Sequence, residues 1–353
     1  MGSTENPQKH PPPSRPRRIG LAVSAILLAG LVVFALSRLD LPRIGHALIT
    51  ATPGWIALAF LLMGSSLVLR SLSWQQTLRA ALPETTISRL PVIRATMIGV
   101  MASAVLPGRI GEPSRVLVLS RRLEGPNRRL LPIVAGTVFS QTLINLLALA
   151  ILAAITFTSV PLLHGQLGGV LTAVAVPLAL CALVLLGPRL LALARRSRRA
   201  RIALTANRIE HALRLARRGL IVFARPRYGA GAVASQLAAW ALQWLACYMV
   251  LLSLGLQAKA GLVSAAAILL AVNVSAILPA TPSNVGVFQA ACLVVLAAYG
   301  VGSGPGLAYG IILQAVEVLT ALALGIPALL GENISWSDLR ASHAVEDSAG
   351  EGP

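Results

Sequence analysis

The sequence predicts an all-α polytopic membrane protein, with about six spanning helices and two re-entrant hairpins arranged as inverted repeats. Hydrophobic residues make up 56% of the 353 residues and charged residues only 12%, whereas roughly 25% of a soluble domain is charged. Apolar runs long enough to cross about 30 Å of hydrocarbon recur along the chain. Two further apolar runs are interrupted by polar turns that contain proline, which is typical of broken membrane helices.

The net charge of +18 comes almost entirely from arginine, which lies in blocks between the apolar runs. Positive loops are retained on the cytoplasmic side of a membrane, so the charge is explained without nucleic acid. We therefore expect membrane lipids as partners and no nucleic acid.

Metal and catalytic chemistry are not indicated. Cys181, Cys247 and Cys292 each lie within an apolar run, without the paired spacing of a metal site. The five histidines are scattered and form no pairing of nucleophile and base with other residues. We expect no cofactor, no metal, no catalytic residues and no enzymatic activity.

The predicted spans are residues 19–37, 54–73, 131–157, 167–187, 230–254 and 305–330. The first could instead be a cleaved signal peptide, with Ala35–Ser37 as the cleavage site, but its apolar length exceeds the usual 7–15 residues. Residues 1–18 read as a disordered basic arm and residues 331–353 as an acidic disordered tail. Arg15, Arg17 and Arg18 place the amino terminus in the cytoplasm, and six crossings return the carboxyl terminus there.

Two membrane halves follow from these spans, residues 19–187 and 230–330, joined by the basic segment 188–229. That segment holds twelve arginines between Arg189 and Arg227, against the single acid Glu210. Its apolar residues recur at near-helical spacing, which favours an amphipathic helix on the anionic inner leaflet. A solvated basic linker is the alternative.

The interrupted runs predict one hairpin in each half, near residues 92–122 and 262–298. A full crossing by residues 92–106 would carry Arg115, Arg121 and Arg122 to the outside, against the positive-inside rule. "VMASAVLP" at 100–107 aligns with "VNVSAILP" at 272–279, an offset of 172 positions. The topology places these hairpins on opposite faces, as in transporters built from inverted repeats.

The two turns are also the predicted binding site. A charge at this depth costs about 2.5–3.5 kcal/mol unless it is paired or hydrated, so Arg109 and Glu112 are functional candidates. Pro113 and Pro282 can each begin a half-helix whose N–H groups attract an anion, for which a lipid phosphate is the natural choice. The alternative is structural: kinks that permit close packing, with Arg109 and Glu112 paired to each other. Glu317 is expected to pair with an arginine or hold a proton, and Arg70 to extend toward the membrane interface.

The core "LPGRIGE" at 106–112 closely resembles the first signature of the flippase-like membrane region associated with lysylphosphatidylglycerol synthases, and the resemblance covers roughly residues 20–330. It implies a bacterial inner-membrane protein with re-entrant segments that moves a lipid between leaflets. We expect a stand-alone member, without the aminoacyl-transferring catalytic domain.

The chain departs from that family at several charged positions. Gln141, Thr142 and Asn145 stand where the family usually has a Glu-Arg pair and a later Asp, and Gln289 stands where it usually has a Glu. Amides can bond a headgroup but cannot relay protons, so a changed substrate or lost activity stays open. The predicted substrate-binding residues are Pro107, Gly108, Arg109, Gly111, Glu112, Arg115, Gln141, Asn145, Pro279, Pro282, Ser283, Asn284, Gly286, Gln289 and Glu317.

Three functional hypotheses remain at this point. The first is a translocator of an anionic phospholipid or a polyprenyl-phosphate-type lipid. The second is a non-transporting scaffold that presents the basic segment to a membrane glycosyltransferase or another lipid-modifying enzyme. The third is a transporter of a small soluble anion.

Overall fold

The computed structural model describes residues 49–105, 111–123, 127–159, 221–276 and 284–331, in which every regular element is helical. Four helices are long and apolar enough to cross a membrane: α3 (Pro53–Ala81), α6 (Asn127–Ser159), α10 (Pro226–Ser253) and α13 (Ser303–Leu330). They match four of the predicted spans. The predicted spans 19–37 and 167–187 lie outside the described residues, as do the amino-terminal arm, nearly all of the basic segment and the tail beyond Gly331.

Local sequence explains where the long helices begin and what they expose. α3 and α10 both start at a proline, Pro53 and Pro226, whose fixed φ and missing N–H suit the first helical position. Large apolar side chains such as Leu61, Val294 and Leu319 are exposed. Lipid is as apolar as the interior of the bundle, so these outward faces are compatible with a bilayer.

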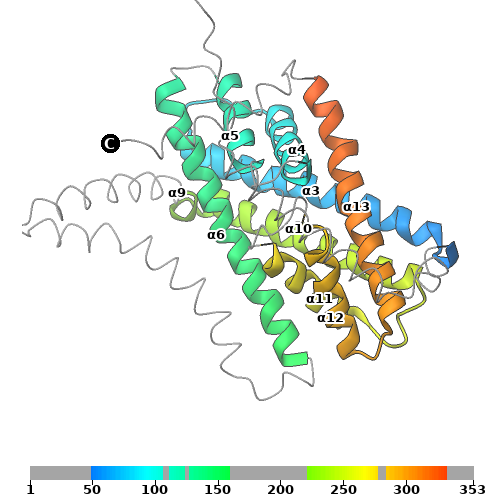
Figure 1. Ribbon diagram of the computed structural model, residues 1–353. Coiled ribbons are helices and arrows are strands. Elements are labelled where there is room, and N and C mark those ends of the chain that lie inside the picture. Colours follow the sequence, from blue (N-terminus) through cyan, green and yellow to red (C-terminus); the bar gives the residue numbers. More distant parts are fainter. Residues whose placement is uncertain (1–48, 106–110, 124–126, 160–220, 277–283, 332–353) are drawn as a thin grey trace, which may run out of the picture.

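Helices α3 and α10 pack together along their lengths and cross the middle of the molecule (Figure 1). Thr52 N donates to Ser253 O at 2.8 Å, and Ser73 Oγ donates to Ala232 O at 2.8 Å. The start of α3 therefore lies beside the end of α10. The two helices run antiparallel.

Two pairs of short helices flank this central pair. α4 (Arg89–Val105) packs on α5 (Gly111–Arg122), and α11 (Leu262–Ser275) packs on α12 (Val287–Ala298). Figure 1 shows α4 and α5 toward the top of the view and α11 and α12 toward the bottom. α4 also packs on α13, and α11 on α6. The single turn α9 (Ile221–Ala224) precedes α10.

Each interrupted apolar run contains two separate helices, and their starts differ in detail from the prediction. α5 begins at Gly111, so Pro113 is its third residue. α12 begins at Val287, so the prediction that Pro282 is its first residue is wrong. The turn before α12 uses a left-handed backbone at Asn284 (φ 52°) and Gly286 (φ 89°), a conformation that asparagine and glycine tolerate best. This turn places the start of α12 five residues later than the proline predicts.

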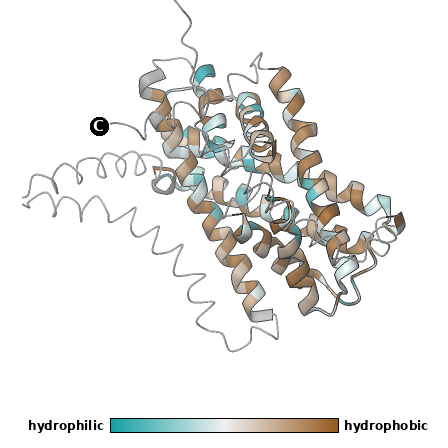
Figure 2. Cartoon of the chain, viewed as in Figure 1, coloured by the Kyte–Doolittle hydropathy of each residue, from teal (hydrophilic) through white to brown (hydrophobic). Residues whose placement is uncertain are grey.

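Glycines let the short helices approach their neighbours closely. A Cβ on Gly111 would collide with the carbonyl oxygen of Gly99 and with Ser103 Oγ, so α4 and α5 nearly touch at their backbones. A Cβ on Gly310 of α13 would lie 3.1 Å from Gln289 Cα of α12. Small residues at such contacts are the usual means by which membrane helices pack. Figure 2 shows α12 and α13 as mainly hydrophobic, with hydrophilic residues gathered among the helices.

Candidate functional site

An ion pair between a buried arginine and an exposed glutamate lies at the start of α5. Arg115 is 7% exposed, and its Nη2 forms an ion pair with Glu112 Oε2. Since α5 begins at Gly111, the two side chains are three residues apart on one face of its first turns. Arg115 Nη1 donates to Gln141 Oε1 of α6 at 2.8 Å. The ion pair is therefore tied to a spanning helix.

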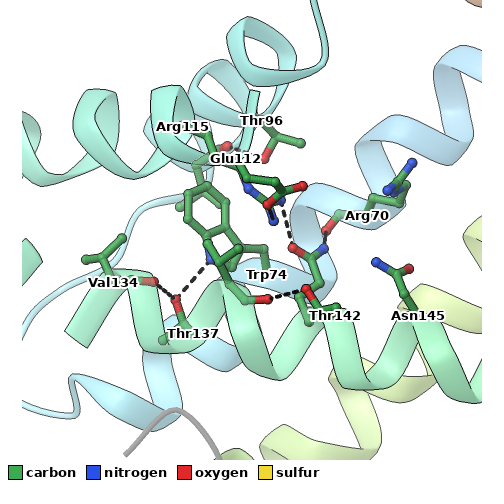
Figure 3. Close-up of polar contacts among 12 residues, drawn as sticks. Arg70, Trp74, Thr96, Glu112, Arg115, Val134, Thr137, Thr142 and Asn145 are labelled. Atoms are coloured by element: carbon green, nitrogen blue, oxygen red, sulfur yellow. Dashed lines mark hydrogen bonds and ion pairs between the residues drawn. The ribbon is translucent and has the colours of Figure 1, made fainter. Parts of the chain in front are cut away.

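The indole ring of Trp74 packs against the guanidinium of Arg115. The Cζ atom of Arg115 lies 4.8 Å from the ring centroid of Trp74, within the range of a cation–π contact. Trp74 Nε1 donates to Thr137 Oγ1 at 3.0 Å, and that hydroxyl donates to Val134 O at 2.7 Å (Figure 3). These bonds fix the ring, which is fully buried. Arg115 is thus held by a carboxylate, an amide and an aromatic face.

From Gln141 the polar contacts continue into the centre of the molecule. Gln141 Nε2 donates to Arg70 O of α3 at 2.9 Å and to Gln236 Oε1 of α10 at 3.3 Å. Gln236 Nε2 donates to Asn145 Oδ1 at 2.6 Å, and Trp240 Nε1 donates to the same oxygen at 3.1 Å. We call Arg115, Gln141, Gln236 and Asn145 the amide chain. It joins helices α3, α5, α6 and α10.

The second half contains a smaller polar contact. Gln289 Nε2 of α12 donates to Gln314 Oε1 of α13, and Gln289 Oε1 accepts from Gly286 N at 2.7 Å. Gln289 therefore caps its own helix and ties it to the next one. One N–H at this helix start is occupied by Gln289, so it is not available to an anion while that bond is intact.

Two more charges lie near the amide chain. Arg70 is half-buried on α3, and it interacts electrostatically with Glu112 and with Glu317 of α13. Glu317 is exposed, although it lies within a spanning helix. With Arg115 and Glu112, these residues make a cluster of two cations and two carboxylates. Figure 3 shows the Arg70 guanidinium apart from the Arg115–Glu112 pair.

The structure gathers part of the predicted site. Gly111, Glu112, Arg115, Gln141 and Asn145 come together, whereas Gln289 joins Gln314 in a separate contact. Glu112 pairs with Arg115. The alternative in which its partner is Arg109 involves a residue outside the described ones. Of the other predicted residues in the two turns, Asn284 and Gly286 lie in the turn before α12. The rest lie outside the described residues: Pro107, Gly108, Arg109, Pro279, Pro282 and Ser283.

Sequence reasoning missed Gln236, Trp240, Gln314 and Trp74. The signal was present, because an uncharged amide inside an apolar span is costly unless it finds a partner. Gln236 and Trp240 are also four residues apart, so they share a helix face. Among the described residues, no three His, Cys, Asp or Glu side chains lie where they could hold a metal ion.

A family model described as "Lysylphosphatidylglycerol synthase TM region" matches residues 19–325. The chain belongs to this family. As a member of the lysylphosphatidylglycerol synthase membrane-region family, it is a multi-pass membrane protein linked to lipid handling. No curated protein and no solved structure matches the chain.

The amide chain makes a direct prediction about stability. Gln236 is fully buried, so Gln236→Leu leaves Asn145 and Gln141 each without one partner. We expect the free energy of unfolding in detergent to fall by about 1–2 kcal/mol. Gln243→Leu is the control on the same helix, because Gln243 makes only a long contact of 3.8 Å to Met63 Sδ. Equal losses in both variants would show that the amide chain adds no stability.

Proposed function

We propose that this protein moves a phosphate-bearing lipid, an anionic phospholipid or a polyprenyl-phosphate-type lipid, between the leaflets of the bacterial cytoplasmic membrane. It does so without enzymatic chemistry and with both termini in the cytoplasm. The link of its family to lipid handling supports the proposal. The arrangement of its helices supports it further.

The two halves correspond helix by helix. In chain order the first half has helices of 29, 17, 12 and 33 residues, α3 to α6, and the second has helices of 28, 14, 12 and 28 residues, α10 to α13. The contacts correspond as well, since α4 packs on α13 while α11 packs on α6. A long helix, two short ones and a second long one form each proposed repeat.

The repeats are inverted in this proposal. α3 and α10 are corresponding helices, and they run antiparallel. About 20 apolar residues are needed to span a bilayer, so α5, α11 and α12 are too short to cross alone. α4 has 17 residues, but Arg89 and Arg94 leave only its second part apolar. The α4–α5 pair then enters from the cytoplasmic face and the α11–α12 pair from the outer face. Transporters of this type bind their substrate between such broken segments.

The observation that carries the proposal is a polar contact between the second short helix and the following long helix in both halves. Arg115 on the second short helix donates to Gln141 on the following long helix, and Gln289 donates to Gln314 in the same way. In each half the first of these residues also bonds three positions back, to Glu112 or to Gly286. Polar groups placed inside an apolar bundle at such a cost are typical of a headgroup path.

We call Arg70, Arg115, Glu112 and Glu317 the polar cluster. It can lower the free-energy barrier to movement of the lipid headgroup across the bilayer. A phosphate that leaves the interface loses its hydration, and guanidinium and amide N–H donors can replace the lost water contacts. The acyl chains can stay in lipid beside the exposed apolar faces of the helices. The protein then supplies a polar route for the headgroup alone.

Transport in proteoliposomes tests the proposal. With a fluorescent phosphatidylglycerol and an impermeant quencher, wild-type protein is expected to expose inner-leaflet lipid, and Arg109→Glu to slow this at least about tenfold. Arg121→Glu is the control, because Arg121 is exposed at the end of α5. If folded protein moves neither phosphatidylglycerol nor a polyprenyl phosphate, the translocator is excluded and the scaffold hypothesis takes its place.

A further inference from the structure

We propose that Arg70 is the phosphate-binding cation of the polar cluster, and that Glu317 is its counter-ion when no ligand is bound. The inference rests on the proposed function only for the source of the phosphate, which is a lipid headgroup there. The binding chemistry itself follows from the charges around Arg70. The sequence alone indicated only a side chain that extends toward the interface.

Of the two arginines in the polar cluster, Arg70 and Arg115, only Arg70 has a guanidinium that is available to a ligand. Among the described residues this guanidinium makes no hydrogen bond and no ion pair. The hydrogen bond that Gln141 donates to Arg70 goes to the backbone oxygen of Arg70. Arg70 is half-buried, so a ligand can reach it. An arginine inside a helix bundle is costly unless an anion or water compensates its charge. The five N–H donors of Arg70 therefore lack a defined partner in the described structure.

Arg115 cannot take this role in the arrangement observed. Its two terminal nitrogens bond Glu112 and Gln141, its face covers Trp74, and it is 7% exposed. Binding a phosphate there would first break the ion pair with Glu112. That step leaves a carboxylate beside the incoming anion, which disfavours binding.

Glu317 lies near Arg70 because α13 packs on α3, where a Cβ on Gly64 would lie 3.9 Å from Thr320 Cγ2 of α13, yet the two charged side chains form no ion pair. Both come from spanning helices, α3 in the first half and α13 in the second. The cluster of Arg70, Arg115, Glu112 and Glu317 is neutral as a whole. A bound phosphate must therefore compete with the Glu317 carboxylate for the positive charge of Arg70. The carboxylate also repels the phosphate.

This competition predicts opposite effects for the two residues. Removing the cation weakens phosphate binding, whereas removing the carboxylate strengthens it. A purely structural role for Glu317 gives no reason for tighter binding. The sign of the Glu317 effect therefore separates a counter-ion from a packing residue.

The experiment uses the full chain in detergent and titrates dihexanoyl phosphatidylglycerol, with dihexanoylglycerol and inorganic phosphate as separate arms. We expect Glu317→Gln to bind the phospholipid about three- to tenfold more tightly than wild type, and Arg70→Gln about tenfold more weakly. Arg70→Lys keeps the charge without the planar fork and is expected to fall between Arg70→Gln and wild type. Dihexanoylglycerol binding should be unchanged in all variants. Thermal unfolding identifies any variant that fails to fold.

Each outcome decides the proposal. Affinity for both the phospholipid and inorganic phosphate that is unchanged in a folded Arg70→Gln variant, or weaker binding of both in Glu317→Gln, overturns it. The same opposite shifts with inorganic phosphate but not with phospholipid retain the phosphate site and assign it to a soluble anion. That result would reject the lipid translocator while keeping Arg70 as the ligand-binding residue. The expected shifts together with no lipid movement in proteoliposomes would likewise reject the translocator alone.

Discussion

Trp74→Ala is expected to lower the free energy of unfolding by about 3 kcal/mol, the largest effect of any single substitution considered for this protein. Trp74 is fully buried in the apolar cluster with Leu78 and Met101. The change removes the indole, opens a cavity and withdraws the ring beneath Arg115. Lipid reduces the hydrophobic part of this loss, but the lost packing contacts are not replaced. Equilibrium unfolding in mixed detergent micelles measures it.

Trp55→Ala is the matched control, since Trp55 lies on the same helix but is 39% exposed. Its loss should stay below about 1 kcal/mol. Trp74→Phe separates the two functions of the ring, because it keeps an aromatic face for Arg115 and removes the donor to Thr137. Equal destabilisation by Trp55→Ala and Trp74→Ala would contradict the packing described for α3.

Gly111→Ala is the second large prediction. The added methyl group would meet the backbone oxygen of Gly99 and Ser103 Oγ, and a backbone atom cannot move aside as a flexible side chain can. We expect α4 and α5 to separate, with a loss of about 2–3 kcal/mol in the free energy of unfolding. Since Glu112 and Arg115 follow on the same helix, we also expect reduced lipid transport.

Gly64→Ala supplies the control for this substitution. A methyl group there would lie 3.7 Å from Leu324 Cδ1, an ordinary contact. Alanine is favoured over glycine inside a helix, so this variant should be neutral or up to about 1 kcal/mol more stable. A neutral Gly111→Ala variant would show that the two short helices do not approach as closely as described.

The resemblance to the family singled out, before the structure, residues that share one helix. Gln141 and Asn145 are four residues apart on α6, and both enter the amide chain. Glu112 and Arg115 are three residues apart, and they lie on one helix because α5 begins at Gly111.

Contacts between distant helices could not be predicted in this way. Gln236 bonds Gln141 because α10 packs beside α3 and α6, and Arg70 comes near Glu317 because α13 packs beside α3. These are consequences of packing, and hydropathy does not encode them. The start of α12 was missed for a local reason, since the positive φ angles at Asn284 and Gly286 extend the turn beyond Pro282.

Cysteine labelling of topology tests most directly whether the two pairs of short helices enter from opposite faces. In a background with Cys181, Cys247 and Cys292 replaced, Arg121→Cys and Gln257→Cys each place one exposed thiol at the end of α5 or before α11. In intact cells, a membrane-impermeant maleimide should label Gln257→Cys and leave Arg121→Cys unlabelled until the cells are opened. If the reagent labels both thiols from outside, α4 and α5 cross the membrane, and the inverted arrangement is wrong.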